Sequence, residues 1–495
     1  MTSYPPSSQT PAGSAGTTGV SPPRLDLPPG ELAEAVQQHP VAYWYLVPPD
    51  RLHHALSQLP ACVRADHPLI QMMHALTAGG TAAIEESTPP DDSPVSHLIQ
   101  SARLRLAGHP RAALERVHTG QIEASLPPAS ALFDTSRGWR PFVTLQSGVT
   151  ALLAGDFSRS AGRLATATLW RLPDEVRTLE REAHAKYALL HALVGDTEIA
   201  RRVLIALDRL PRSASWTEPE IDYAARLAGH LVTPDPAADA RDPLLAADAR
   251  ELWPFGLWAL LRPIYRRGHL DDALGLLTQV EHAEPPGLRG DGVARSVIPI
   301  ARAMAHRLRG DHAAARAALE AADPDCDLTL SGRALVLLDS GLYDAAIHTA
   351  EQVIARSGEL RRLRISSTGV IAAALLRRGD GTGATDLLRR CLAHTRPPSD
   401  DELAAMPADA ARLLRALRHE GGSAPGDAAT GDGALTRGEE HLLVLLATTM
   451  TRQEIADELY LSINTIKTRC HRLYRRLGVQ SRTAAVAEAR RRGLI

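Results

Sequence analysis

Glycine-containing turns recur along most of the chain, and their spacing constrains the fold more than any other feature. Successive glycines lie 47, 40, 73, 42, 31 and 38 residues apart. The 73-residue interval is about twice the others, which indicates one unit without its glycine. A period of this length is typical of stacked helical hairpins. The turn glycines are Gly108, Gly155, Gly195, Gly268, Gly310, Gly341 and Gly379.

Two positions after each glycine repeat as well. The fifth residue is alanine, with serine in one unit, and the ninth is aliphatic. Glycine permits a tight turn, a small residue lets two helices approach, and a larger apolar residue fills the core beyond that point. The pattern predicts two antiparallel helices around each glycine. The fifth positions are Ala113, Ser160, Ala200, Ala273, Ala315, Ala346 and Ala384, and the ninth are Val117, Leu164, Leu204, Leu277, Leu319, Ala350 and Leu388.

This pattern resembles the middle of the tetratricopeptide (TPR) repeat: its turn glycine, small residue and following aliphatic residue. The aromatic positions usual in that family are mostly absent and the period varies, so the match is to a degenerate, TPR-like solenoid. Aromatic residues make up only 4% of the chain, which favours helix over strand. We therefore predict an all-α fold, with a non-repetitive helical bundle as the alternative because Ala and Leu are frequent.

Composition divides the chain into four segments. Residues 1–30 are rich in Pro, Ser, Thr and Gly and are predicted to be a disordered tail. Residues 31–419 form the TPR-like body, 420–434 ("GGSAPGDAATGDGA" from Gly421) a flexible linker, and 435–495 a small terminal domain. The start of the chain has neither a basic segment nor an apolar run, and no stretch approaches the roughly 20 apolar residues of a membrane span. We expect a cytoplasmic protein without membrane contact.

Four short helices are predicted within residues 435–495. Two begin at capping boxes, TxxE from Thr436 and from Thr451, and the third follows Ser462 as N-cap. The third covers about 463–477 and the last about 481–492. In the third, four apolar residues recur at intervals of four, three and four, which predicts one buried stripe. These residues are Ile466, Cys470, Leu473 and Leu477.

Positive charge is concentrated in this domain. It holds 11 Lys+Arg against 6 Asp+Glu, a net charge of +5, so the rest of a chain of net charge -2 carries -7. No acidic residue lies between Glu458 and Glu488. Lys467, one of only two lysines, lies in this interval on the same helix face as His471 and Arg475. Such a local basic surface is typical of nucleic-acid binding.

The same residues resemble the LuxR-type helix-turn-helix family. The matching pieces are "LT" with Glu439, "EIADELYLS" (454–462), "NTIKT" (464–468) and "LYRRLGVQSRTAAV" (473–486). The resemblance implies that the third helix enters the major groove of double-stranded DNA and that the last helix forms a homodimer. Gly438, Thr449 and Arg469 depart from the family pattern, where Arg, Gly and His are usual.

Carrying the family's roles over gives a set of predicted DNA contacts. Lys467, Thr468 and His471 match positions that reach into the groove. Arg469 keeps or adds charge beside them. The remaining members match positions that contact backbone phosphates, and these are Asn464, Thr465, Arg475, Arg476 and Arg482.

The sequence lacks the common catalytic and cofactor motifs. The sequence contains no GxxxxGK[ST], HExxH or GxSxG, and "DPDCD" (323–327) lacks the later residues of a calcium loop. We predict no enzyme, no cofactor and no metal. The chain resembles the repeat and DNA-binding parts of the large ATP-binding LuxR regulators without their ATPase.

The leading hypothesis is a sequence-specific transcriptional regulator whose body senses an unknown effector or protein partner. A TPR-like interaction scaffold with a degenerate DNA-binding tail is the alternative. An enzyme with a cryptic site in the solenoid groove is a third, remoter reading.

Overall fold

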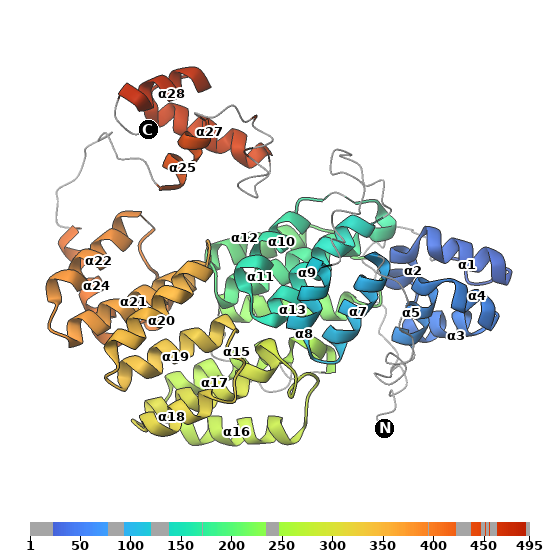
Figure 1. Cartoon of the computed structure of the whole chain (residues 1–495), viewed down its shortest axis with the longest axis horizontal. Coiled ribbons are helices and arrows are strands. Elements are labelled where there is room, and N and C mark those ends of the chain that lie inside the picture. The colour runs from blue at the N-terminus through green and yellow to red at the C-terminus, as the bar shows by residue number, and fades with distance from the viewer. Residues whose placement is uncertain are drawn as a thin grey trace.

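The computed structural model of this chain is built from helices, with no strand among the residues that it describes (Figure 1). The described residues are 23–77, 94–119, 138–170, 172–233, 247–394, 396–421, 437–446, 451, 455 and 463–491. The first lobe packs five short helices around Val36, Leu56 and Ile70. These are α1 (Pro29–Gln38), α2 (Pro40–Leu46), α3 (Pro49–Ser57), α4 (Ala61–Asp66) and α5 (Pro68–Thr77).

Every turn glycine found in the sequence lies between two packed helices, so the predicted hairpins are present. In Figure 1 they run from α7 in blue to α22 in orange. The relation to TPR repeats stays a prediction. The pairs are α7 (Pro94–Leu106) with α8 (Pro110–Thr119), α9 (Trp139–Ala154) with α10 (Phe157–Ala167), α11 (Thr178–Leu193) with α12 (Thr197–Asp208), α15 (Trp253–Arg266) with α16 (Leu270–His282), α17 (Gly292–Leu308) with α18 (His312–Leu319), α19 (Asp327–Asp339) with α20 (Tyr343–Arg356), and α21 (Arg361–Arg377) with α22 (Gly381–His394).

The small residue at the fifth position is buried in all seven hairpins, with an exposed fraction of 0% each time. The backbone can therefore approach its partner helix as predicted. In the α9–α10 hairpin the hydroxyl of Ser160 also donates to the Gly148 carbonyl at 2.9 Å. The 73-residue interval contains α13 (Glu218–Val232), and residues 234–246 of it lie outside the described part.

Gly195 differs from the other turn glycines. The other six have φ between 74° and 88°, the left-handed region that favours glycine. Gly195 does not, but a Cβ there would lie 2.3 Å from Nδ1 of His191. Lack of space, rather than backbone conformation, requires glycine at this turn.

Six of the seven hairpins form two stacks that the turns join together. We call α7–α12 the first stack and α17–α22 the second stack. The Gly108 carbonyl accepts from the N–H of Asp291 at 2.9 Å, directly before α17, and the Gly155 carbonyl accepts from Asp327 at the start of α19 at 3.1 Å. The Gly195 carbonyl accepts from Arg362 in the first turn of α21 at 3.2 Å. Three successive turns thus satisfy N–H groups that helix starts leave without an intrahelical partner.

A buried polar network centred on Lys186 of α11 joins the first stack to α2 and α13. The side chain of Lys186 is 1% exposed, and its Nζ donates to Glu220 Oε1 at 2.6 Å. Burial raises the pKa of Glu182, which accepts a hydrogen bond from the Tyr45 hydroxyl at 3.0 Å. Burial also works to raise the pKa of Glu220, but the neighbouring Lys186 ammonium outweighs it and holds that pKa below its usual value. The network ties α2, α11 and α13 together.

The body ends in two further helices, α23 (Asp400–Ala404) and α24 (Ala408–Gly421). Asp401 of α23 pairs with Arg262 of α15 at 3.2 Å, and with Arg266 and Arg362. Burial opposes its ionisation, but the arginines, Arg362 first, lower the pKa of Asp401 to about 2. One carboxylate therefore fastens the end of the body to two earlier hairpins.

The predicted disordered tail and linker lie mostly outside the described residues. Residues 23–30, placed in the tail by composition, are described and belong to the first lobe. Leu25 and Leu27 pack against its core, and the Tyr43 hydroxyl donates to the Arg24 carbonyl at 2.8 Å. The tail boundary at residue 30 is therefore too late, because composition does not register two leucines among prolines. No helix among the described residues is long and apolar enough to cross a membrane.

Candidate nucleic-acid interface

The terminal domain has a hydrophobic core of its own, drawn from residues 442–489. Ile466, Cys470, Leu473 and Leu477 are 0–3% exposed, so the predicted buried stripe is confirmed. They pack with Leu442, Leu443, Leu446, Ala485 and Ala489. Its helices are α25 (Arg437–Leu446), α27 (Ile463–Leu477) and α28 (Arg482–Arg491), each of which contacts the other two (red in Figure 1).

Local signals fix the end of α27 and the start of α28. Gly478, at φ 73°, ends α27, and the Val479 N–H returns to the Tyr474 carbonyl at 2.9 Å. The Ser481 hydroxyl then accepts from the Ala484 N–H at 3.2 Å and caps α28. The predicted second helix lies largely outside the described residues, but Ile455 is helical and buried.

Opposite the buried stripe, α27 presents basic side chains to solvent. Lys467, Arg469, His471 and Arg475 are exposed, and Lys467, His471 and Arg475 follow one another at intervals of four. Residues four apart are neighbours on a helix surface, so these three form one row. Asn464, Thr465 and Thr468 belong to the same helix, but their side chains lie outside what the structure describes.

Two predicted phosphate contacts have partners inside the domain. Arg476 donates to Glu439 of α25 at 2.6 Å. Arg482 donates through Nε to the Leu446 carbonyl at 2.8 Å, at the end of α25 where helix carbonyls lack intrahelical partners. The structure therefore gives both arginines a role in holding α25 against α27 and α28.

One exposed cation of α27 was not among the predicted contacts. Arg472 lies three residues before Arg475 and is exposed beside it. Arg472 lies in the acid-free interval of the sequence, which indicated a basic surface. The family resemblance, however, assigns no DNA contact to its position.

Among the described residues no group of three His, Cys, Asp or Glu side chains could hold a metal ion.

Comparison with known proteins identifies this domain. Residues 433–489 match the family described as "Bacterial regulatory proteins, luxR family". The carboxyl-terminal domain is a LuxR-family helix-turn-helix domain. Over 86 residues, 17% of its length, this chain is 35% identical to the transcriptional regulatory protein LiaR of Bacillus subtilis. Over 61 residues, 12% of this chain, it is 44% identical to the probable transcriptional regulatory protein NarL of Mycobacterium tuberculosis.

Each of these two matches covers less than a fifth of this chain. They span 38% of the length of LiaR and 28% of the length of NarL. The predicted resemblance of the terminal domain is confirmed, and the match extends two residues before the predicted start at 435. The family match does not include the helical body.

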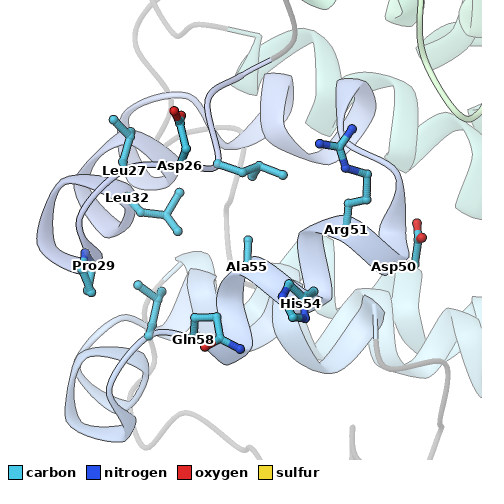
Figure 2. A pocket seen from close by; sticks show the side chains of 11 residues that line it. Asp26, Leu27, Pro29, Leu32, Asp50, Arg51, His54, Ala55 and Gln58 are labelled. Atoms are coloured by element: carbon cyan, nitrogen blue, oxygen red, sulfur yellow. The ribbon is translucent and has the colours of Figure 1, made fainter.

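A cavity of about 570 Å³ lies in the first lobe of the helical body. Figure 2 shows Leu32 of α1, and Arg51 and His54 of α3, around it. Its volume lies within the range of small-molecule sites, about 300–1,000 Å³. The lining residues are Leu25, Asp26, Leu27, Pro29, Leu32, Asp50, Arg51, His54, Ala55, Gln58 and Leu59.

Proposed function

We propose that this protein is a sequence-specific, DNA-binding transcriptional regulator in which α27 reads the major groove. The basic, acid-free row of α27, held on a folded LuxR-family domain, carries this proposal. An α-helix fits the major groove, and Lys and Arg side chains reach both phosphates and base edges. The folded core of the domain also argues against the alternative of a degenerate tail on a scaffold protein.

We propose a separate role for each of the side chains on this surface. Lys467, with Thr468 and His471, contacts base edges, and Arg475 contacts phosphates. We assign Arg472 to the phosphates as well, because it is exposed beside Arg475. Asn464 and Thr465 remain proposed phosphate contacts at the start of α27, with Arg469 flanking the groove. Arg476 and Arg482 act mainly by holding α25 in place.

The partners and the place of action follow from this proposal. The last helix, α28, would join two copies, so that two α27 helices meet half-sites about one helical turn apart. The helical body would receive an effector, with the cavity of the first lobe as its candidate site. The protein would act in the cytoplasm, with no catalytic step of its own.

Selection from random duplex DNA with the full-length protein tests the proposal. We expect enrichment of a palindrome by the wild type. Lys467→Ala should weaken binding to the selected site by roughly 1–3 kcal/mol and relax the preference at one base position. Salt titration should show affinity falling with ionic strength.

Two outcomes would contradict the proposal. One is the absence of enrichment with both the full-length protein and the isolated LuxR-family domain. The other is binding that does not depend on salt. Arg316→Ala, an exposed arginine on α18, is the matched control and should leave the selected motif unchanged.

A further inference from the structure

Net positive charge is not confined to the LuxR-family domain. Residues 361–421, the last segment of the helical body, hold eleven arginines and seven acidic residues, a net charge of +4. Residues 1–360 hold 33 Lys+Arg and 42 Asp+Glu, a net charge of -9. The end of the body therefore differs in sign from everything before it.

Several arginines of this segment are committed to ion pairs within the body. Arg361 pairs with Glu402 at 2.7 Å, and Arg377 pairs with Asp339 at 2.8 Å and Asp409 at 2.9 Å. Arg362 pairs with Asp401. These contacts hold α21, α23 and α24 together and leave little charge for another partner.

Two arginines of α24 are different. Arg412 and Arg415 are exposed, and within the described part of the chain no acidic side chain lies within ion-pair distance of either. Asp409, one turn before Arg412, is already paired with Arg377. The two arginines lie three residues apart, and Arg418, which donates to the Pro398 carbonyl at 3.3 Å, continues the row. We call Arg412, Arg415 and Arg418 the α24 arginine row.

Helix-dipole stabilisation does not account for this row. Cations stabilise a helix within its last turn. Arg412 and Arg415 are the fifth and eighth of the 14 residues of α24, before that turn. The apolar face of the helix is supplied by Ala410, Leu414 and Leu417, which are buried on the other side.

The row lies on the last helix before the LuxR-family domain. Fifteen residues, 422–436, separate the end of α24 from the start of α25. A chain of that length spans at most about 50 Å in any conformation. This distance is about one and a half turns of B-DNA, at roughly 34 Å a turn. DNA held by α27 therefore stays within reach of α24.

We propose that the α24 arginine row binds the phosphate backbone of the DNA that flanks the site read by α27. This inference rests on the proposed function and extends it from the terminal domain to the helical body. Guanidinium groups suit phosphate because their parallel N–H donors match its oxygens. Contacts of this kind add affinity and fix orientation without reading sequence.

The test measures the salt dependence of binding to the selected site with the full-length protein and two duplexes. The short duplex carries the site alone, and the long duplex adds about 20 base pairs on each side. Each phosphate contact contributes roughly 0.9 to the slope of log K against log salt concentration. Wild type should show a steeper slope on the long duplex, and Arg412→Ala/Arg415→Ala should lower that slope by about 2 for each subunit, or about 4 for the proposed dimer. On the short duplex the variant and wild type should agree.

Arg226→Ala/Arg316→Ala is the matched control, because it removes two exposed helix-surface arginines from the acidic part of the body. It should leave both slopes unchanged. Equal slopes for wild type and the α24 variant on the long duplex would overturn the inference, and would leave the row to an acidic protein partner. If wild type binds neither duplex in a salt-dependent way, the proposed function itself fails. An unchanged thermal melt of the variant excludes unfolding as the cause.

Discussion

The two lysines of this chain occupy opposite environments. Lys467 is exposed on the basic face of α27, whereas the side chain of Lys186 is 1% exposed in the core of the first stack. An ammonium group is a compact point charge on a flexible stem, whereas guanidinium is a wide planar fork. We infer that lysine is used in the core because one narrow donor must fit between Glu220 and its buried neighbours. The sequence places the two lysines but cannot show that one is buried.

Replacing Lys186 should be strongly destabilising. Lys186→Met leaves Glu220 and Glu182 without their nearby cation, and removing one partner of a buried pair costs about 3–5 kcal/mol. Lys186→Met/Glu220→Gln removes both charges and should restore part of that loss. Urea denaturation measures the free energy of unfolding. Arg201→Met, which breaks the exposed pair with Glu198, should cost no more than about 1 kcal/mol. Equal losses of unfolding free energy in Lys186→Met and Arg201→Met would contradict the argument that burial makes the Lys186 pair the costlier one to break.

His191 should make stability depend on pH. Burial lowers its pKa to about 4, and its Nδ1 accepts from the Asp196 N–H at 3.2 Å. In the unfolded chain this histidine titrates near pH 6.5. As the pH falls from about 6.5 to 4, only the unfolded state gains a proton, so the free energy of unfolding falls by about 3 kcal/mol. His191→Gln keeps an acceptor and should remove this loss. The measurement is the difference in unfolding free energy between variant and wild type from pH 7 to 4.

Asp327 changes stability with pH in the direction opposite to His191, so its contribution must be separated from that of His191. Burial raises its pKa to about 6, against the effect of Arg356, so the folded state takes up a proton first and gains stability as pH falls from about 6 to 4. The wild-type curve therefore contains two opposed contributions. Parallel curves for wild type and His191→Gln would show that His191 does not titrate as described.

At the scale of elements, the turn glycines fall into two groups that one sequence pattern had merged. A Cβ at Gly155 would lie 2.4 Å from Sγ of Cys326, in the loop before α19, whereas a Cβ at Gly341 would meet nothing within 4 Å. Both have φ 77°. The first glycine is required by contact between the stacks, and the second only by its turn.

This difference predicts unequal costs for the same substitution. Gly341→Ala should cost about 1–2 kcal/mol, from the left-handed backbone alone. Gly155→Ala adds overpacking against Cys326 and should cost roughly 1–3 kcal/mol more. Thermal unfolding of the two variants side by side measures the difference. Equal shifts in melting temperature would mean that the contact between stacks relaxes freely.

The sequence predicted those features that depend on neighbours along the chain. The hairpins follow from the glycine, alanine and aliphatic spacing, and the buried stripe of α27 follows from the helical period. The contacts of Gly108, Gly155 and Gly195 with the second stack could not be predicted, because they join main-chain atoms more than 160 residues apart. The partners of Arg476 and Arg482 could not be predicted for a similar reason, because they depend on where α25 lies relative to α27 and α28.

At the scale of the molecule, the LuxR-family domain and the helical body have separate cores. We expect two unfolding transitions in calorimetry. Leu473→Ala, in the core of the domain, should lower its transition and abolish DNA binding, since a buried leucine contributes about 2–5 kcal/mol. Leu338→Ala, in the core shared by α19, α21 and α24, should lower the transition of the body alone. A single transition shifted by both variants would contradict separate folding.

The hydrogen bonds between the two stacks use carbonyl and N–H groups that every residue but proline possesses. Divergence can therefore rewrite most side chains along this joint while the joint itself persists, provided that the few glycines with no room for a Cβ are kept. Descendants of a common ancestor could share this architecture with very little letter-by-letter identity. Kinship among such bodies is better sought in the spacing of their glycines than in overall identity.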